Sequence, residues 1–312
     1  MSKTAAAHDV NSAKPQSYYW TGAALVFGSA FCFALKGIFI KMAYQYGIDT
    51  ISLLTLRMVF SAPIFGFVAF RLYQQPANVA LKKVEWLWVA ALGVWGYYVS
   101  SYFNFLGFNY ITAGMERVLL FTYPTFVVLI NALLGKRKIT TMQIVALLLT
   151  YAGILTAFLQ NVNSAQQKNL PLGAFWVILS GFTYALYLIG SDGIIPKVGP
   201  QKFTVYAMLA ATVATVSHCA IANGLDLFGF VPQVYWIGIA MAIFVTAIPT
   251  FMLAEGIKRL GSSNASIINS IGPVFTIVLA TTILGEAISG VQVAGTFLVL
   301  LGVLLIGWKG KN

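Results

Sequence analysis

Long apolar blocks alternate with short polar segments along almost the whole chain. Each block is close to the roughly 20 residues that a helix needs to cross about 30 Å of hydrocarbon, at about 1.5 Å per residue. The pattern therefore predicts an all-α, polytopic membrane protein with ten transmembrane helices. The predicted spans are Trp20–Ala43, Thr50–Phe70, Val84–Phe108, Ala113–Leu134, Ile139–Leu159, Pro171–Ser191, Phe203–Asn223, Gln233–Gly256, Ser262–Leu284 and Ile288–Trp308.

The composition agrees with this pattern. Of the 312 residues, 59% are hydrophobic and only 9% are charged, whereas a soluble globular domain carries roughly 25% charged residues. The lipid bilayer is therefore the expected surrounding of most of the chain. Cys32 and Cys219 both lie inside apolar blocks, where thiols usually serve as small packing groups. We predict no disulfide framework, no metal site and no cofactor.

The formal charge of +11 raises nucleic acid as an alternative partner, and the position of the charges argues against it. With the N-terminus inside, 14 of the 19 basic residues fall in cytoplasmic segments, namely Lys3, Lys14, Arg71, Lys82, Lys83, Lys136, Arg137, Lys138, Lys197, Lys202, Lys258, Arg259, Lys309 and Lys311. The positive-inside rule then puts both termini in the cytoplasm, as an even number of spans also requires. We expect a multi-pass protein of the inner (plasma) membrane. Residues 1–19 would form a polar cytoplasmic tail.

The two halves of the chain share a motif at a spacing near 150 residues. Pro124, Gly135, Gln143 and Gly153 correspond to Pro273, Gly285, Gln292 and Gly302. We predict one repeat at residues 20–160 and a second at 170–308, with five spans in each. An odd number of crossings forces the second copy to enter from the opposite side, so the repeats have inverted topology, which recurs in transporters. A duplication that only enlarged a helix bundle is the alternative.

These residues make the sequence resemble the EamA branch of the drug/metabolite transporter superfamily. The most specific carriers are Pro273, the run Leu284-Gly285-Glu286, and Gln292 followed by Gly295 and Gly302. The resemblance covers residues 20–308. It implies two inverted five-helix repeats and a central substrate cavity lined mainly by the first four helices of each half. One position departs from the family: Lys136 follows Gly135 where an acidic residue is common, so an acidic helix cap is missing there.

Four charged residues fall inside predicted spans at similar depths in the outer half of the membrane: Lys36, Arg57, Glu116 and Arg117. A charge at the centre of a helix costs roughly 2.5–3.5 kcal/mol on insertion scales, so such residues are functional candidates. Three cations and one carboxylate leave excess positive charge, which a carboxylate or phosphate of a substrate would balance. The alternative is that Glu116 pairs with Lys36 or Arg57 while Arg117 extends to the outer interface.

The corresponding positions of the second half carry no charge. Tyr187 corresponds to Lys36 and Met208 to Arg57, so the sequence predicts an asymmetric site in which Tyr187 is a further substrate-binding candidate. Asn269 precedes Pro273 within the ninth span. Because Pro124 and Pro273 free backbone carbonyls at midplane depth, we expect helix bends at both, close to the substrate.

The third span is rich in aromatic residues. At a period of 3.6 residues, Tyr98, Tyr102, Phe105 and Asn109 share one face. That face combines apolar surface with hydroxyl and amide groups, which suits an organic solute with polar ends. Core packing of the same residues is the alternative, and we select Tyr98 and Tyr102 as candidates for substrate binding.

The hypothesis that follows is a secondary transporter of a small organic metabolite, such as an amino acid or another anionic or zwitterionic solute. It would work by alternating access, with export as the favoured direction and protons at Glu116 as a candidate coupling ion. A monomer and a homodimer are both compatible with the sequence. A multidrug efflux transporter is the first alternative, and a non-transporting receptor or structural membrane protein is the second. An enzyme is not expected, because His8 and His218 are the only histidines and no nucleophile is paired with a base.

Overall fold

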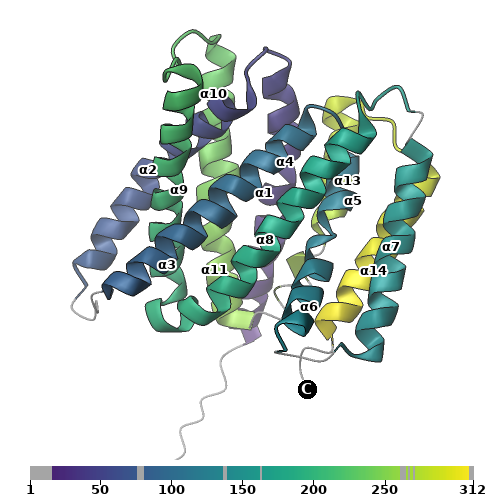
Figure 1. Ribbon diagram of the computed structural model, residues 1–312, viewed down its shortest axis with the longest axis horizontal. Coiled ribbons are helices and arrows are strands. Elements are labelled where there is room, and N and C mark those ends of the chain that lie inside the picture. Colours follow the sequence, from purple (N-terminus) through teal and green to yellow (C-terminus); the bar gives the residue numbers. More distant parts are fainter. Residues whose placement is uncertain are drawn as a thin grey trace, which may run out of the picture.

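The computed structural model describes residues 16–75, 81–135, 139–161, 164–260, 265, 268–269 and 271–308. Within these residues every regular element is helical (Figure 1). The first half contains α1 (Gln16–Tyr44), α2 (Thr50–Tyr73), α3 (Lys83–Gly93), η1 (Val94–Val99), α4 (Ser100–Phe108), α5 (Ala113–Leu120), α6 (Tyr123–Leu133) and α7 (Thr141–Asn161). The second contains α8 (Leu170–Val198), α9 (Pro200–Asn223), α10 (Pro232–Ala240), η2 (Met241–Ala247), α11 (Ile248–Leu260), α13 (Gly272–Leu284) and α14 (Gly290–Trp308).

In the part of the chain that the structure describes, seven helices are long and apolar enough to cross a membrane: Gln16–Tyr44, Thr50–Tyr73, Ala113–Leu133, Thr141–Asn161, Leu170–Val198, Pro200–Asn223 and Pro232–Leu260. Shorter apolar helices cover Gly272–Leu284 and Gly290–Gly302. The predicted all-α, polytopic membrane fold is confirmed at this level. The predicted ninth span starts at Ser262, and most of its first nine residues lie outside the described part of the chain.

Large apolar side chains cover the outside of the bundle. Phe67 is 64% exposed, Leu148 66% and Ile221 87%. Burying such a side chain gains about 1.5–3 kcal/mol over leaving it in water, and a surface of this kind is stable when lipid tails surround it. The outward face of the bundle is therefore a lipid-facing surface.

The helices lie side by side, and α7 and α14 form a pair at one edge of the bundle (Figure 1). Close approach of the two helices depends on glycine. A side chain at Gly153 would meet the backbone of Gly295, and one at Gly302 would meet Thr150. Small residues at such a crossing let two membrane helices pack backbone to backbone.

The two ends of the bundle differ in charge. The helix α1 begins and α14 ends at the lower edge of Figure 1, where α2 and α11 also end. This edge carries the described basic residues Arg71, Lys82, Lys83, Lys197, Lys202, Lys258 and Arg259. The opposite edge, where α1 ends and α8 begins, carries Lys41 and Lys168. The asymmetry follows from the sequence, since each basic group stands at a helix end.

Irregular turns occur at corresponding places in the two halves. The π-helical segment η1 interrupts the helix between α3 and α4, and η2 does the same between α10 and α11. Such segments often mark functional sites. The second irregularity precedes proline: Pro124 stands in the first turn of α6 and Pro273 in the first turn of α13. Proline fits there because the first helical N–H groups lack intrahelical partners.

The helices α6 and α13 also end alike. Gly135 follows α6 with a φ of 67° and Gly285 follows α13 with a φ of 66°. Only glycine adopts this left-handed conformation without a steric cost, so glycine suits both positions. Gly285 is itself the C-cap of α13, whereas Gly135 stands one residue after Leu134, the C-cap of α6.

Candidate functional site

Lys36, Asn104 and Glu116 form a buried polar junction of three elements. Lys36 Nζ on α1 donates to Asn104 Oδ1 on α4 at 2.8 Å, and Asn104 Nδ2 donates to Glu116 Oε1 on α5 at 2.6 Å. Lys36 Nζ also lies 3.7 Å from Glu116 Oε1, with 2% of the Glu116 side chain exposed. Because hydrogen bonds to charged groups are about twice as strong as neutral ones, this junction holds the three helices in register.

The start of α5 is fixed by two side chains that accept from its first N–H groups. Thr112 Oγ1 accepts from Met115 N at 3.3 Å. Glu286, from the connection between α13 and α14, accepts from Ala113 N at 2.7 Å and Gly114 N at 3.1 Å. A carboxylate at a helix N-terminus also interacts favourably with the helix dipole. A residue of the second half therefore positions the helix that carries Glu116.

Arg57 on α2 is buried, with 6% of its surface exposed, and has no acidic partner among the described residues. Its guanidinium lies 5.0 Å from the centre of the Phe105 ring. Its Nε has no hydrogen-bond partner within the described part of the chain. A cation over an aromatic face is stabilised by roughly 0.5–2 kcal/mol, which is small beside the cost of removing a guanidinium from water.

Arg117 on α5 points into the bundle rather than to the interface. A side chain at Gly272 would collide with its guanidinium, so Arg117 reaches the break before Pro273. Its guanidinium lies 6.0 Å from the centre of the Phe121 ring, and its buried Nε has no hydrogen-bond partner. The buried Oδ1 of Asn269, three residues before Gly272, has none either.

Lys36 lies near the other three charges, and the positive charge of the four is in excess. Lys36 lies within electrostatic range of Glu116, Arg117 and Arg57. Among the described residues, Glu116 makes an ion pair only with Lys36, and neither arginine makes one. Two guanidinium groups thus remain without a neutralising carboxylate.

Tyr98 and Tyr102 both contact His218 of α9. The hydroxyl of Tyr98 and Nδ1 of His218 form a hydrogen bond of 2.7 Å. The rings of Tyr102 and His218 are 5.0 Å apart, edge to face. Phe103 stacks on Trp176 of α8 beside them, with ring centres 5.6 Å apart.

Tyr187 belongs to a second group of tyrosines. Its hydroxyl donates to the hydroxyl of Tyr97 at 3.0 Å, and its ring stacks on Tyr184 at 5.6 Å. Tyr184 in turn packs edge to face on Tyr123, which lies within electrostatic range of Arg117. Met208, the second-half position that corresponds to Arg57, is 2% exposed in an apolar core. The structure thus brings Lys36, Arg57, Glu116 and Arg117 together, with the two tyrosine groups as separate contacts.

Comparison with known proteins gives the chain a family. The model of the EamA-like transporter family matches residues 20–159 and again residues 171–308. The chain belongs to the EamA-like transporter family. The predicted membership is confirmed, and this EamA protein is a membrane transporter.

Relatives agree with the assignment. The chain is 32% identical over 280 residues to an uncharacterized transporter, YcbK, of Bacillus subtilis, covering 87% of this chain and 89% of the relative. It is 26% identical to an uncharacterized transporter, sll1319, of Synechocystis, covering 83% and 82%. A solved crystal structure superimposes with a TM-score of 0.62 at 14% identity over 94% of this chain and 99% of that one, which shows a shared fold.

Sequence reasoning missed two residues of the EamA site. Asn104 was one polar residue in an aromatic span, and its amide proves to join Lys36 to Glu116. Glu286 entered the sequence argument only as part of the motif Leu284-Gly285-Glu286, and it proves to accept from two backbone N–H groups. A carboxylate that follows a helix-ending glycine is a signal for such a cap. Glu255 pairs with Lys258 and Arg259 at 3.6 and 2.8 Å, as their spacing along a helix permits.

Proposed function

We propose that this EamA protein is a secondary transporter of a small organic solute that carries a carboxylate or phosphate, as an anion or a zwitterion. The observation that supports it is the pair of guanidinium groups of Arg57 and Arg117, each with a buried Nε, that lack a carboxylate partner among the described residues. A guanidinium presents a planar set of donors that matches carboxylate and phosphate oxygens. A negatively charged group between the two would offset the cost of burying them.

The proposal includes alternating access by two mirrored halves. Each half would cross the membrane five times, giving ten crossings and cytoplasmic termini in an inner membrane. Matching π-helical segments, proline breaks and glycine caps in the two halves support a duplicated architecture. The basic residues at the edge where α1 begins support a cytoplasmic position for that edge. We keep export as the proposed direction.

Glu116 is the proposed site of proton coupling. It is 2% exposed and bridges Asn104 and Lys36, so its protonation would weaken the junction of α1, α4 and α5. An inward proton gradient should then drive transport by wild-type protein and fail to drive it in Glu116→Gln.

A multidrug efflux transporter is the second candidate. The contacts of Tyr98 and Tyr102 with His218, and of Phe103 with Trp176, favour it, because aromatic surfaces bind many organic cations. A binding region built mainly on these rings would accept cationic drugs and would not need Arg57 or Arg117.

Counterflow in proteoliposomes tests the proposal. Vesicles loaded with one unlabelled solute are assayed for uptake of its labelled form, using glutarate, glutamate, alanine and putrescine as a charge series. We expect exchange of at least one anionic or zwitterionic solute, with loss of at least about ten-fold in Arg57→Gln and in Arg117→Gln, since each removes a charge-assisted contact. Arg259→Gln, a cation paired with Glu255 at the lower edge, is the matched control and should retain exchange.

Three results would contradict the proposal. Exchange of putrescine alone would favour the efflux candidate. Equal exchange by the wild type and both arginine variants would remove the role of the guanidinium groups. Absence of exchange for any solute would favour a receptor or structural protein.

A further inference from the structure

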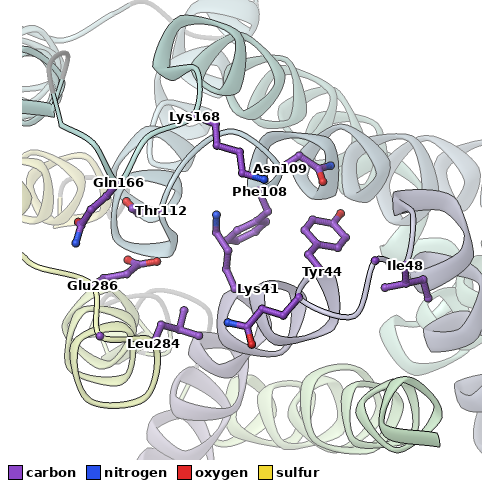
Figure 2. A pocket seen from close by; sticks show the side chains of 13 residues that line it. Lys41, Tyr44, Ile48, Phe108, Asn109, Thr112, Gln166, Lys168, Leu284 and Glu286 are labelled. Carbon is purple, nitrogen blue, oxygen red and sulfur yellow. The ribbon is translucent and has the colours of Figure 1, made fainter. Parts of the chain in front are cut away.

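The upper face of the molecule contains a hollow of about 580 Å³. Its walls come from the end of α1, the end of α4, and the connections that precede α8 and α14 (Figure 2). None of the charged residues Lys36, Arg57, Glu116 and Arg117 lines it. Phe108, which is fully buried, lines the hollow and packs close to Gly37 of α1.

Two lysines reach into this hollow from different elements. Figure 2 shows Lys41 and Lys168 with their side chains directed into the same space. The backbone at Lys168 is fixed, since its N–H donates to Tyr110 O at 2.9 Å. The Lys41 ammonium lies within electrostatic range of the Lys168 ammonium and of the Glu286 carboxylate. Among the described residues neither lysine forms an ion pair.

The acidic residue that lines the hollow does not neutralise these lysines by contact. Both oxygens of Glu286 already accept hydrogen bonds, from Ala113 N at 2.7 Å and Gly114 N at 3.1 Å. Its charge stabilises the start of α5. An occupant of the hollow therefore meets two ammonium groups against one carboxylate that is already hydrogen-bonded.

We propose that the hollow is a second anion-binding site, which holds a carboxylate or phosphate group of a small solute between Lys41 and Lys168. Tyr44 and Phe108 supply an aromatic wall for an organic body. Lys41 follows Lys36 by five residues, or about 7.5 Å along α1 at about 1.5 Å per residue. A solute bound here lies nearer the end of α1 than the buried charged residues do. This place on a transport route rests on the proposed function, whereas binding at the lysines does not.

Residue-specific protection measures such binding directly. The full-length protein in phosphatidylcholine nanodiscs is treated briefly with acetic anhydride at constant ionic strength, and acetylation of each lysine is quantified by mass spectrometry. Glutarate and inorganic phosphate are the probes, and putrescine is the cationic control. We expect at least one anion to slow acetylation of both Lys41 and Lys168 about three-fold or more, because an anion held between them occupies both ammonium groups. Lys258, 73% exposed at the opposite edge, should be unaffected.

A variant tests whether the two lysines act together. Lys41→Gln should remove the protection of Lys168, and the matched control Lys258→Gln should preserve it. The proposal is overturned if neither anion protects, if Lys258 is protected equally, or if Lys168 remains protected in Lys41→Gln. It is also overturned if protection requires phosphatidylglycerol in the disc and no soluble anion, because the occupant is then a lipid headgroup.

Failure here can be told apart from failure of the proposed function. Arg57→Gln should lose anion counterflow and retain protection of Lys41 and Lys168. Protection without counterflow of any anion would leave this site standing and remove the proposed function. Counterflow that depends on Arg57, without protection of either lysine, would remove this site and leave the proposed function standing.

Discussion

The two segments matched by the EamA model share their backbone irregularities and differ in their charged side chains. Both contain a π-helical segment, a break before proline and a left-handed glycine cap. Among the described residues, the buried charges of the first are Arg57 and Glu116, and the buried charge of the second is Glu286, which caps α5. Lys36 and Arg57 correspond to Tyr187 and Met208, and Glu116 corresponds to Ala265, which is 1% exposed. The backbone irregularities are thus duplicated, whereas the two arginines that lack a carboxylate partner among the described residues belong to one half.

Under the proposed function, this difference makes the substrate site asymmetric. A symmetric pair of bundles would present equal groups to the solute from both halves. Here the first half presents cations, and the second presents a tyrosine network and apolar packing. The two halves are nevertheless connected, because Glu286 of the second half accepts hydrogen bonds from the first N–H groups of α5 in the first half.

The largest expected effect comes from breaking the buried junction. In Glu116→Gln, Lys36 loses its ion-pair partner, and we expect a stability loss of about 3–5 kcal/mol, the usual result of removing one member of a buried pair. Unfolding in mixed micelles of increasing denaturing detergent measures it. Glu255→Gln, which breaks ion pairs at the exposed lower edge, should cost under about 1 kcal/mol. Equal losses in the two variants would contradict the account. The triple variant Lys36→Met, Asn104→Leu and Glu116→Leu, which leaves no member of the junction unpaired, should recover most of the loss.

The next effect comes from removing the Glu286 cap, by which the second half stabilises the start of α5. Glu286→Gln exchanges a carboxylate for an amide that has a single acceptor, and we expect a loss of about 1.5–3 kcal/mol, the range for hydrogen bonds to charged groups. Hydrogen exchange should rise at Ala113 and Gly114. Glu85→Gln alters an exposed carboxylate cap, in which Lys82 N donates to Glu85 Oε2 at 2.9 Å, and should cost about 1 kcal/mol or less. Unchanged exchange at the start of α5 would argue against the cap.

A smaller effect compares the two glycines of the α7–α14 contact. Gly153→Ala and Gly302→Ala each place a methyl group against backbone of the partner helix, so we expect similar losses of about 1–3 kcal/mol from overpacking. Gly66→Ala, on α2 with no atom within 4 Å of the added carbon, should raise stability by about 0.5–1 kcal/mol. Thermal unfolding of the three variants separates the outcomes. A loss confined to one of the paired glycines would show that the contact is not symmetric.

The smallest effect concerns the uncharged half. Tyr187→Phe removes the hydrogen bond to Tyr97 and should cost about 1 kcal/mol of stability. Counterflow should change by a few-fold at most, far less than in Arg57→Gln. A loss as large as that of the arginine variant would show that both halves recognise the solute equally.

Much of the fold follows from local sequence signals. Uninterrupted apolar blocks place the helices, and the pairs Pro124 with Pro273 and Gly135 with Gly285 mark matching breaks and ends. The π-helical segments carry no comparable signal, because an extra residue in a turn is selected by packing between distant helices. Gly96, inside η1, packs on Tyr187, ninety-one positions later in the chain. Tertiary contact of this kind is invisible in the local pattern.

The charged candidate residues could be selected from the sequence, whereas their contacts could not. Intramembrane charge alone selects Lys36, Arg57, Glu116 and Arg117. Which of them pair depends on helix rotation: Asn104 lies between Lys36 and Glu116, and Arg117 turns toward Gly272. Positions read from a helical period shift by a fraction of a turn after a π-helical segment, so the predicted face of Tyr98, Tyr102, Phe105 and Asn109 separates into different contacts. Phe105 packs on Arg57, and Asn109 donates to Thr50 at 2.9 Å.

Mirror-related halves are the central claim, and loop accessibility tests it most directly. Gln75, after α2, and Asp226, after α9, occupy corresponding exposed connections 151 positions apart. Gln75→Cys and Asp226→Cys are made separately in a chain with Cys32→Ala and Cys219→Ala, and intact cells are treated with a membrane-impermeant maleimide. We predict that Asp226→Cys reacts in intact cells and that Gln75→Cys reacts only after the membrane is opened. Reaction of both positions from the same side would contradict the inverted arrangement.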